Sequence, residues 1–167
     1  MSPYRIIGID PGLNVTGYGI IELEGDASPQ LYRYGHIKTN GRKTLSERIF
    51  QIYSTLNELI LEHHPQVMAI EDIFYAENVK TAIVMGHARG AAMVAGMNNG
   101  LNVYEYTARE VKMSVVGNGA ASKAQVKFMV QRLLNQREAI KPDDASDALA
   151  VAICHWHRQE HERRIGS

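Results

Sequence analysis

The sequence predicts an α/β fold in which five strands form a mixed sheet covered by helices. Short apolar runs at residues 4–10 and 66–71 have the length and composition of buried strands. Longer segments, of which residues 44–64 are the clearest, repeat their apolar residues at helical spacing. Strands that alternate with helices indicate a sheet with helices packed on its faces.

The first three strands are expected at residues 4–10, 16–24 and 30–39. Pro11 and Gly12 form a turn after the first strand, and turn-forming residues near 25–29 separate the second from the third. Connections this short join antiparallel neighbours, so we expect these strands to form a meander.

The later elements alternate along the chain. We expect a helix at 44–64, a strand at 66–71, a helix at about 78–99, a strand at 102–106, and helices at about 107–115, 122–135 and 143–161. The order βββαβαβ, followed by C-terminal helices, indicates a mixed sheet. Without an internal repeat, low-complexity tract or linker, residues 1–167 are expected to form a single domain.

The composition excludes several classes of protein. Apolar residues make up 45% of the 167 residues and charged residues 22%, which is ordinary for a globular protein. No run approaches 18 apolar residues, so we expect no membrane span, and residues 1–5 lack the layout of a signal peptide. The one cysteine, Cys154, excludes an internal disulfide and agrees with a reducing cytosol, so a cytoplasmic location is expected.

Charge is balanced over the whole chain but not along it. The 18 Lys and Arg residues equal the 18 Asp and Glu residues. Residues 78–137, however, hold eight basic and two acidic residues, a net charge of +6. This basic middle segment suits binding to phosphates, although a solvated helical face would have the same composition.

Four acidic residues at separated places indicate a metal site. Asp10 closes the first apolar run and Glu71 closes the second. Asp144 and Asp147 stand at i,i+3 on one face of an expected helix. Carboxylates at two strand ends that face two more on a helix provide hard oxygen ligands, which suit Mg²⁺. A pair of Mg²⁺ ions suits phosphodiester hydrolysis.

Two of these positions have acidic neighbours. Asp143 or Asp144 can face Asp147, and either can cap the helix that follows Pro142. Strand alternation puts Glu71 and Asp72 on opposite sides, so only one of that pair can join the site, and Glu71 is the better candidate.

The arrangement resembles the ribonuclease-H-like nuclease fold and, within it, the family of bacterial Holliday-junction resolvases, RuvC. The resemblance rests on motifs that occur in the family's order over nearly the whole chain. They are Gly8-Ile9-Asp10-Pro11-Gly12 with Thr16-Gly17-Tyr18-Gly19, Ala69-Ile70-Glu71-Asp72-Ile73-Phe74, Gly86-His87-Ala88-Arg89-Gly90, Ala108-Arg109-Glu110-Val111-Lys112 with Val115-Val116-Gly117, and Asp144-Ala145-Ser146-Asp147-Ala148-Leu149-Ala150.

The resemblance implies a Mg²⁺-dependent endonuclease that cuts four-way DNA junctions by paired nicks in recombination and repair. Asp10 would bridge two Mg²⁺ ions, Glu71 would share one, and Asp144 with Asp147 would complete the shell; the choice between Mg²⁺ and Mn²⁺ stays open. The family also implies that Lys112 and Lys123 contact DNA near the scissile phosphate, with Lys112 catalytic.

Further DNA contacts and partners follow from the same resemblance. An aromatic side chain at Phe74 would stack on unpaired bases, as the family's does. Arg89, with Lys127 and Arg132, is a weaker candidate for phosphate contacts. The small residues of the helix over 78–99 suit close helix packing, and the family implies a homodimer there, working beside a branch-migration complex of the RuvA and RuvB type.

Other functions remain open at this stage. A nuclease of the same fold that cuts structured RNA would need the same carboxylates. The turn after Asp10 loosely resembles the phosphate loop of actin-like ATPases and sugar kinases, and a protein that binds junctions without cutting them is a third alternative. The stretch from Cys154 to His157, with His161, matches no zinc spacing and is expected to be structural.

Overall fold

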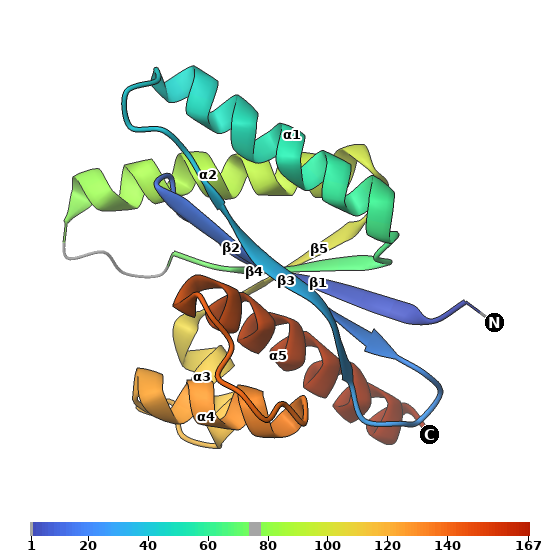
Figure 1. The fold of residues 1–167 in the computed structure, drawn as a ribbon. Coiled ribbons are helices and arrows are strands. Elements are labelled where there is room, and N and C mark those ends of the chain that lie inside the picture. The colour runs from blue at the N-terminus through green and yellow to red at the C-terminus, as the bar shows by residue number, and fades with distance from the viewer. Residues whose placement is uncertain (1, 74–77) are drawn as a thin grey trace.

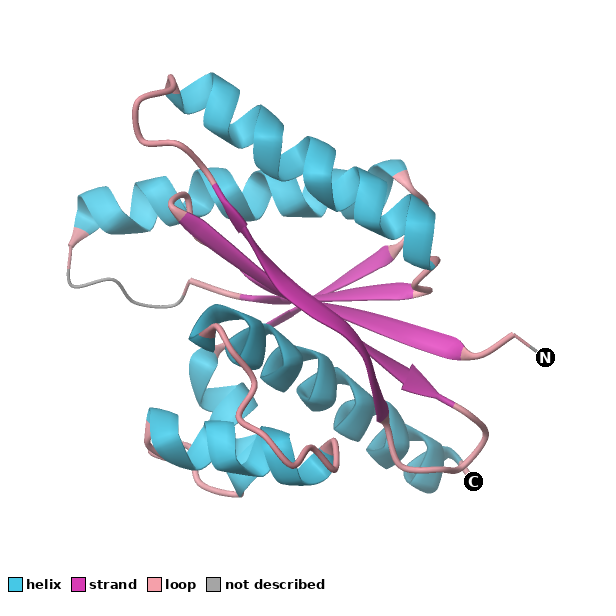
Figure 2. Cartoon of the chain, viewed as in Figure 1, coloured by secondary structure: helices cyan, strands magenta, loops and turns pink. Residues whose placement is uncertain are grey.

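The computed structural model describes residues 2–73 and 78–167, and it places a five-stranded sheet between two layers of helices (Figure 1, Figure 2). The elements are β1 (Tyr4–Asp10), β2 (Val15–Leu23), β3 (Gln30–Lys38), α1 (Leu45–His63), β4 (Val67–Glu71), α2 (Val79–Asn98), β5 (Asn102–Tyr106), α3 (Ala108–Val116), α4 (Lys123–Leu133) and α5 (Asp143–Gly166).

The sheet has the strand order β3-β2-β1-β4-β5. Strands β1, β2 and β3 form the predicted antiparallel meander, whereas β4 runs parallel to β1 and β5 runs parallel to β4. The predicted mixed α/β fold is therefore confirmed, and the two central strands are the apolar runs that were most evident in the sequence.

Each face of the sheet has its own core. Helices α1 and α2 cover one face, and α5 covers the other with α3 and α4 packed outside it (Figure 1). Side chains alternate between the two cores along β1, because Ile6 packs toward α5 and Ile7 toward α1 and α2. Both isoleucines are fully buried. Burial on both faces explains why β1 is an unbroken apolar run.

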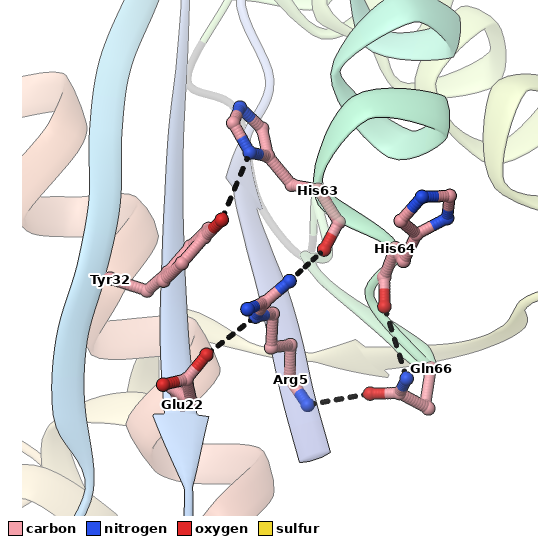
Figure 3. A network of polar contacts seen from close by, with 6 residues as sticks. All are labelled: Arg5, Glu22, Tyr32, His63, His64 and Gln66. Atoms are coloured by element: carbon pink, nitrogen blue, oxygen red, sulfur yellow. Dashed lines mark hydrogen bonds and ion pairs between the residues drawn. The ribbon is translucent and has the colours of Figure 1, made fainter. Parts of the chain in front are cut away.

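A polar network fastens the end of α1 to the start of β1 (Figure 3). The Arg5 guanidinium donates to Glu22 on β2 at 2.6 Å and to the backbone carbonyl of His63, the last residue of α1, at 2.7 Å. The backbone N–H of Arg5 donates to the Gln66 side chain at 2.6 Å, immediately before β4. Because these bonds join three elements, they fix where β4 starts beside β1.

The ends of the helices differ slightly from those expected. Ser122 caps α4 by accepting a hydrogen bond from the backbone N–H of Gln125, as the sequence predicts. Helix α5 continues to Gly166, five residues beyond its expected end. Its last turns carry an Arg158–Glu162 ion pair at 2.9 Å instead of apolar residues, so apolar spacing could not reveal them. Among all helices that the structure describes, none is long and apolar enough to cross a membrane.

Helix α5 lies unusually close to the sheet because glycines face it. A Cβ atom on Gly8 would overlap the backbone carbonyl of Ala148, and one on Gly17 would overlap that of Asp144. Gly8 lies directly opposite Gly19 in the β1–β2 pair, so the bare backbone extends over both strands. A glycine inside a strand often marks such close approach of another backbone.

We predict that Gly8→Ala destabilises the fold, because the added methyl would push α5 away from β1. Overpacking of this kind lowers the free energy of unfolding by roughly 1–3 kcal/mol, which urea denaturation would measure. Gly41→Ala is the matched control, since no atom of the described residues lies within 4 Å of its added Cβ. Equal stability of the two variants would show that α5 can shift freely on the sheet.

Candidate active site

Two carboxylates meet at the carboxyl edge of the sheet. Asp10 ends β1 and Glu71 ends β4. These strands are parallel neighbours in which Ile9 pairs with Ile70, so the residues that follow them stand side by side. The Arg5 network at the opposite edge helps to fix this register.

Helix α5 brings two more carboxylates to the same place. The backbone of Asp144 lies against Gly17, the residue that pairs with Asp10 across β1 and β2. Asp147 follows one turn later on the same face of the helix. The positive end of the helix dipole favours negative charge in the first turn of α5, which Asp144 occupies.

The four carboxylates line one cleft of about 210 Å³. Its other walls come from α3, α4 and the middle of α5, and they are mostly apolar. The lining residues are Asp10, Glu71, Ala108, Val111, Lys112, Lys123, Val126, Asp144, Asp147, Ala150 and Val151. The structure thus brings together the acidic residues and the two lysines that the sequence singled out.

The acidic neighbours lie outside this cleft. Asp143 is the first residue of α5 and forms an ion pair with Lys127 on α4. The prediction that an aspartate side chain caps this helix is wrong, because Pro142 occupies the cap position and no side chain bonds there. Asp72 turns toward α2, where it pairs with Arg89 at 3.3 Å.

The lysines stand on the helical side of the cleft. The Lys123 ammonium lies 3.3 Å from a carboxylate oxygen of Asp147, and that carboxylate raises the lysine's pKa. Lys112 reaches the cleft from α3, and its charge acts to lower the pKa of Glu71. Both lysines are therefore positioned beside the carboxylates.

Burial and like charge shift the acid–base behaviour of the cleft. Burial raises the pKa of Asp10 to about 9, and the charge and hydrogen bond of Glu71 add to the effect. Burial also raises the pKa of Glu71 and that of Asp147, although Lys123 opposes the shift at Asp147. In the free protein, a proton on Asp10 and the ammonium of Lys123 thus offset part of the negative charge.

The donor set suits a divalent cation, but the cage is not preformed. Within the described residues, no three Asp, Glu, His or Cys side chains converge closely enough to hold an ion as they stand. The four carboxylates are nevertheless hard oxygen donors around one cleft. The raised pKa values of Asp10, Glu71 and Asp147 reflect burial and, to a smaller degree, neighbouring carboxylates, and a bound cation would relieve both.

Other predicted DNA contacts lie elsewhere. Arg89 on α2 is mostly buried and forms ion pairs with Asp72 and with Glu105 of β5, away from the cleft. Lys127 pairs with Asp143, and the Arg132 guanidinium lies over the Phe128 ring. A DNA-binding role for these three cations stays a prediction.

The contact predicted for Phe74 lies outside the described residues.

The expected structural role of the C-terminal histidines agrees with their contacts. His155 is buried and lies 2.7 Å from the Tyr106 hydroxyl through its Nδ1 atom. His157 contacts the Ser114 hydroxyl at 3.0 Å.

Sequence reasoning missed the glycines that shape the site. Gly8, Gly17 and Gly19 bear no functional group, yet they let α5 approach until its carboxylates reach Asp10. The sequence does contain a signal for them. Gly17 and Gly19 stand at alternate positions of one strand, so they share a face, and glycine inside a strand indicates that another backbone comes close to that face.

Comparisons with known proteins agree with this geometry. The family model described as "Crossover junction endodeoxyribonuclease RuvC" matches residues 6–155. The RuvC of Citrifermentans bemidjiense is 51% identical over 152 residues, which cover 91% of this chain and 92% of that protein. The RuvC of Alkaliphilus oremlandii is 49% identical over the same shares of the two chains.

Solved structures give the same result. Thermus thermophilus RuvC in complex with a Holliday junction substrate superposes with a TM-score of 0.90 at 31% identity, covering 95% of this chain and 96% of that one. The yeast mitochondrial Holliday junction resolvase Ydc2 has a TM-score of 0.65 at 15% identity, covering 97% of this chain and 84% of that one, and shows the fold alone.

The fold and the carboxylate cleft define a nuclease of the ribonuclease-H-like class. Within that class, the chain belongs to the crossover junction endodeoxyribonuclease RuvC family. Membership does not favour the ATPase or binding-only hypotheses that the sequence left open.

We predict that the stability of the metal-free protein depends on Asp10. Its carboxyl keeps a proton up to about pH 9 in the folded state but loses it near 3.8 when unfolded. Between these values the unfolded chain binds fewer protons, so the free energy of unfolding falls as pH rises. Asp10→Asn escapes this loss and should exceed the wild type at about pH 8 by at least ~1.4 kcal/mol, the value of one pKa unit.

Urea denaturation in EDTA at about pH 5 and pH 8 measures the effect, because the advantage of the variant should shrink at the lower pH. A wild type that gains stability relative to Asp10→Asn as pH rises would contradict the assignment.

Proposed function

We propose that this protein resolves four-way DNA junctions by a pair of symmetric, metal-dependent nicks. The observation that carries the proposal is the single cleft in which four carboxylates face two lysines. Support comes from the RuvC family to which the chain belongs and from the Thermus relative, whose structure contains a Holliday junction substrate.

The carboxylates would hold two Mg²⁺ ions, for which Mn²⁺ can substitute. Asp10 lies between Glu71 on the neighbouring strand and the two aspartates of α5, so it would help to hold both ions. Glu71 would share one ion, and Asp144 with Asp147 would complete the shell. Such ions supply an activated water and stabilise the leaving oxygen.

The lysines act on the phosphate itself. Lys112 and Lys123 extend from α3 and α4 into the cleft and place positive charge beside the scissile group. A fixed ammonium stabilises the negative charge that develops in the transition state. Lys123 is paired with Asp147 in the free protein, so its charge is already held at the reacting edge.

The apolar wall of the cleft strengthens these charges. Val111, Val126 and Val151 line the cleft on the side of α3, α4 and α5. Apolar side chains exclude water and lower the local dielectric, so each charge acts more strongly on the substrate. The same wall contributes to the burial that raises the pKa of Asp10.

We further infer a homodimer in which α2 packs against its copy. One face of α2 contacts the sheet and α1 through Ala88, Ala92 and Ala95. The opposite face is a stripe of apolar and small residues at helical spacing. The members of this stripe are Val79, Ile83, Gly86, Gly90, Val94 and Met97.

The stripe suits close contact between helices. Its four apolar side chains are each more than half exposed, and a Cβ added to Gly86 or Gly90 would meet no atom of the described residues within 4 Å. Glycine costs a helix roughly 1 kcal/mol relative to alanine, so two helical glycines with no close neighbour in the described part of the chain need another explanation. A two-fold dimer would present two active sites to the two strands that are cut.

Two predictions from the sequence complete this proposal. They are cooperation with a branch-migration complex of the RuvA and RuvB type and a cytoplasmic location.

We predict that Asp144→Asn abolishes cutting of a mobile four-way junction and leaves junction binding nearly intact. Loss of one metal-binding carboxylate removes catalysis, while the surface that contacts DNA is retained. Cleavage in Mg²⁺ with mapped nick positions measures the first effect, and gel shift in Ca²⁺ measures the second. The rate should fall at least about 100-fold, the scale of losing one stabilising group in a transition state.

Asp143→Asn is the matched control, because its carboxylate pairs with Lys127 outside the cleft and it should cut nearly as fast as the wild type. Linear duplex and an RNA–DNA hybrid should stay uncut. If the protein cut the RNA–DNA hybrid and not the junction, the proposed junction substrate would be wrong.

For the dimer, we predict that Ile83→Glu shifts the protein toward monomers, since it buries a charge in the proposed interface. Sedimentation equilibrium measures the change, and Ile165→Glu, at another exposed isoleucine near the end of α5, is the control. The Ile83 variant should nick one strand at a time. An unchanged molecular mass would place the interface elsewhere.

A further inference from the structure

A second groove adjoins the acidic cleft. It has a volume of about 460 Å³ and lies between the β1–β2 turn and the first turns of α2. Asp144 lines both the cleft and this groove, so the two hollows meet the same residue. Lys112 and Lys123 stand on the cleft side of Asp144, and the groove leads away from them.

Among the described residues, one cation lines the groove, and three more lie at the end of the partner strand of its wall and in the turn that follows. Lys80 lines it from α2. Val15 lines it from the start of β2, and Lys38 lies directly opposite Val15 in the β2–β3 pair. Because cross-strand partners project to the same face of a sheet, the Lys38 side chain leaves β3 on the same face as that of Val15. Arg42 and Lys43 follow in the exposed turn after β3.

Hydrogen bonds fix that turn to the wall of the groove. The Thr39 hydroxyl donates to the Leu13 carbonyl at 2.6 Å, and its backbone N–H donates to the Asn14 carbonyl at 3.0 Å. Arg48 on α1 donates to the Thr39 hydroxyl at 2.9 Å and to the Asn14 side chain at 2.5 Å. The basic turn is therefore held in place before any ligand arrives, which lowers the entropy lost on binding.

These cations are available to a ligand. Over residues 2–73 and 78–167, no ion pair involves Lys38, Arg42, Lys43 or Lys80. Two carboxylates lie near them: Asp144 lines the groove together with Lys80, and Glu47 has its pKa lowered mainly by hydrogen bonds with Thr44 and to a smaller degree by the charge of Lys43. By contrast, Lys123 and Lys127 are paired with aspartates.

The lining of the groove selects among possible ligands. Its apolar members are aliphatic, and no aromatic side chain is among the described residues that form its walls. Nucleic-acid bases bind by stacking on aromatic rings, whereas exposed lysine and arginine bind backbone phosphates. The chemistry therefore favours phosphates over bases.

We propose that this groove binds the backbone phosphates of the double-stranded DNA arm that leads away from the cleavage point. The proposal rests on the proposed function, because it extends the path of the cut strand beyond Asp144. It assigns Lys38, Arg42, Lys43 and Lys80 to sequence-independent contacts that hold the arm while the cleft acts on the scissile phosphate.

The test compares the salt dependence of DNA binding in Ca²⁺ for the wild type and for the double variant Arg42→Gln with Lys43→Gln. Each lost phosphate contact lowers the slope of log affinity against log salt by about 0.9, so the double variant should lose about 1.8. Between about 50 and 200 mM salt, the affinity of the wild type should then fall about tenfold more than that of the variant. Lys80→Gln alone should lower the slope by about 0.9.

The control variant removes two exposed cations elsewhere. Arg33→Gln with Arg164→Gln changes the net charge equally, at a strand position and near the end of α5 that are both outside the groove. Its slope should match the wild type.

A slope for the Arg42–Lys43 variant equal to that of the wild type, or equal losses in the control, would overturn the proposal. The assay includes linear duplex, which separates the two proposals. If the Arg42–Lys43 variant has a lower salt slope than the wild type on linear duplex, and the wild type does not cut junctions, the groove proposal is supported and the resolvase function is refuted. If the wild type cuts junctions and the Arg42–Lys43 variant keeps the wild-type slope, the resolvase function is supported and the groove proposal is refuted. A wild type that binds no DNA would refute both.

Discussion

The contact between α5 and the bare backbone of β1 and β2 determines the geometry of the whole carboxyl edge. Because Gly8 and Gly17 have no side chain, the helix backbone itself comes close to both strands, and Asp144 reaches Gly17, the partner of Asp10 across β1 and β2. Any side chain at these glycines would move the helix and its two carboxylates together. Glycine lowers the stability of a strand. Here the same glycines allow the sheet and the helix to form one site.

Close packing also concentrates negative charge. Asp10 and Glu71 stand at adjacent strand ends, and Asp147 approaches from the helix. Two unit charges about 4 Å apart repel by ~4 kcal/mol at an effective dielectric near 20. The free protein reduces this repulsion with a proton on Asp10 and with the ammonium of Lys123. A bound divalent cation would make both unnecessary, and the relief of this repulsion would add to its affinity for the site.

Much of the fold could be predicted from the sequence because its signals are local. Apolar runs revealed β1 and β4, and the cap at Ser122 followed from one residue beside a helix. The four carboxylates of the cleft could be predicted because adjacent strand ends place Asp10 and Glu71 at one edge of the sheet, and i,i+3 spacing places Asp144 and Asp147 on one face of a helix. The choice between Asp143 and Asp144 could not be settled from spacing, since both spacings to Asp147 share a helix face.

Contacts between residues that are far apart in the sequence could not be predicted from local sequence patterns. Arg89 looked free in the sequence, but folding places it between Asp72 and Glu105. Lys38 and Lys80 lie on different elements, and only the register of β3 with β2 shows that Lys38 stands opposite Val15, which lines the groove with Lys80. The length of α5 was underestimated because its last turns depend on ion pairs rather than on apolar spacing.

Helix α5 also separates the reactive end of the molecule from its carboxyl terminus. Its 24 residues span about 36 Å at a rise of 1.5 Å per residue, from Asp143 beside the cleft to Gly166 (Figure 1). A fluorophore or affinity tag joined after Ser167 would stand at the far end of this rod. Single-molecule measurements made through such a label would follow the enzyme on DNA without obstructing the cut.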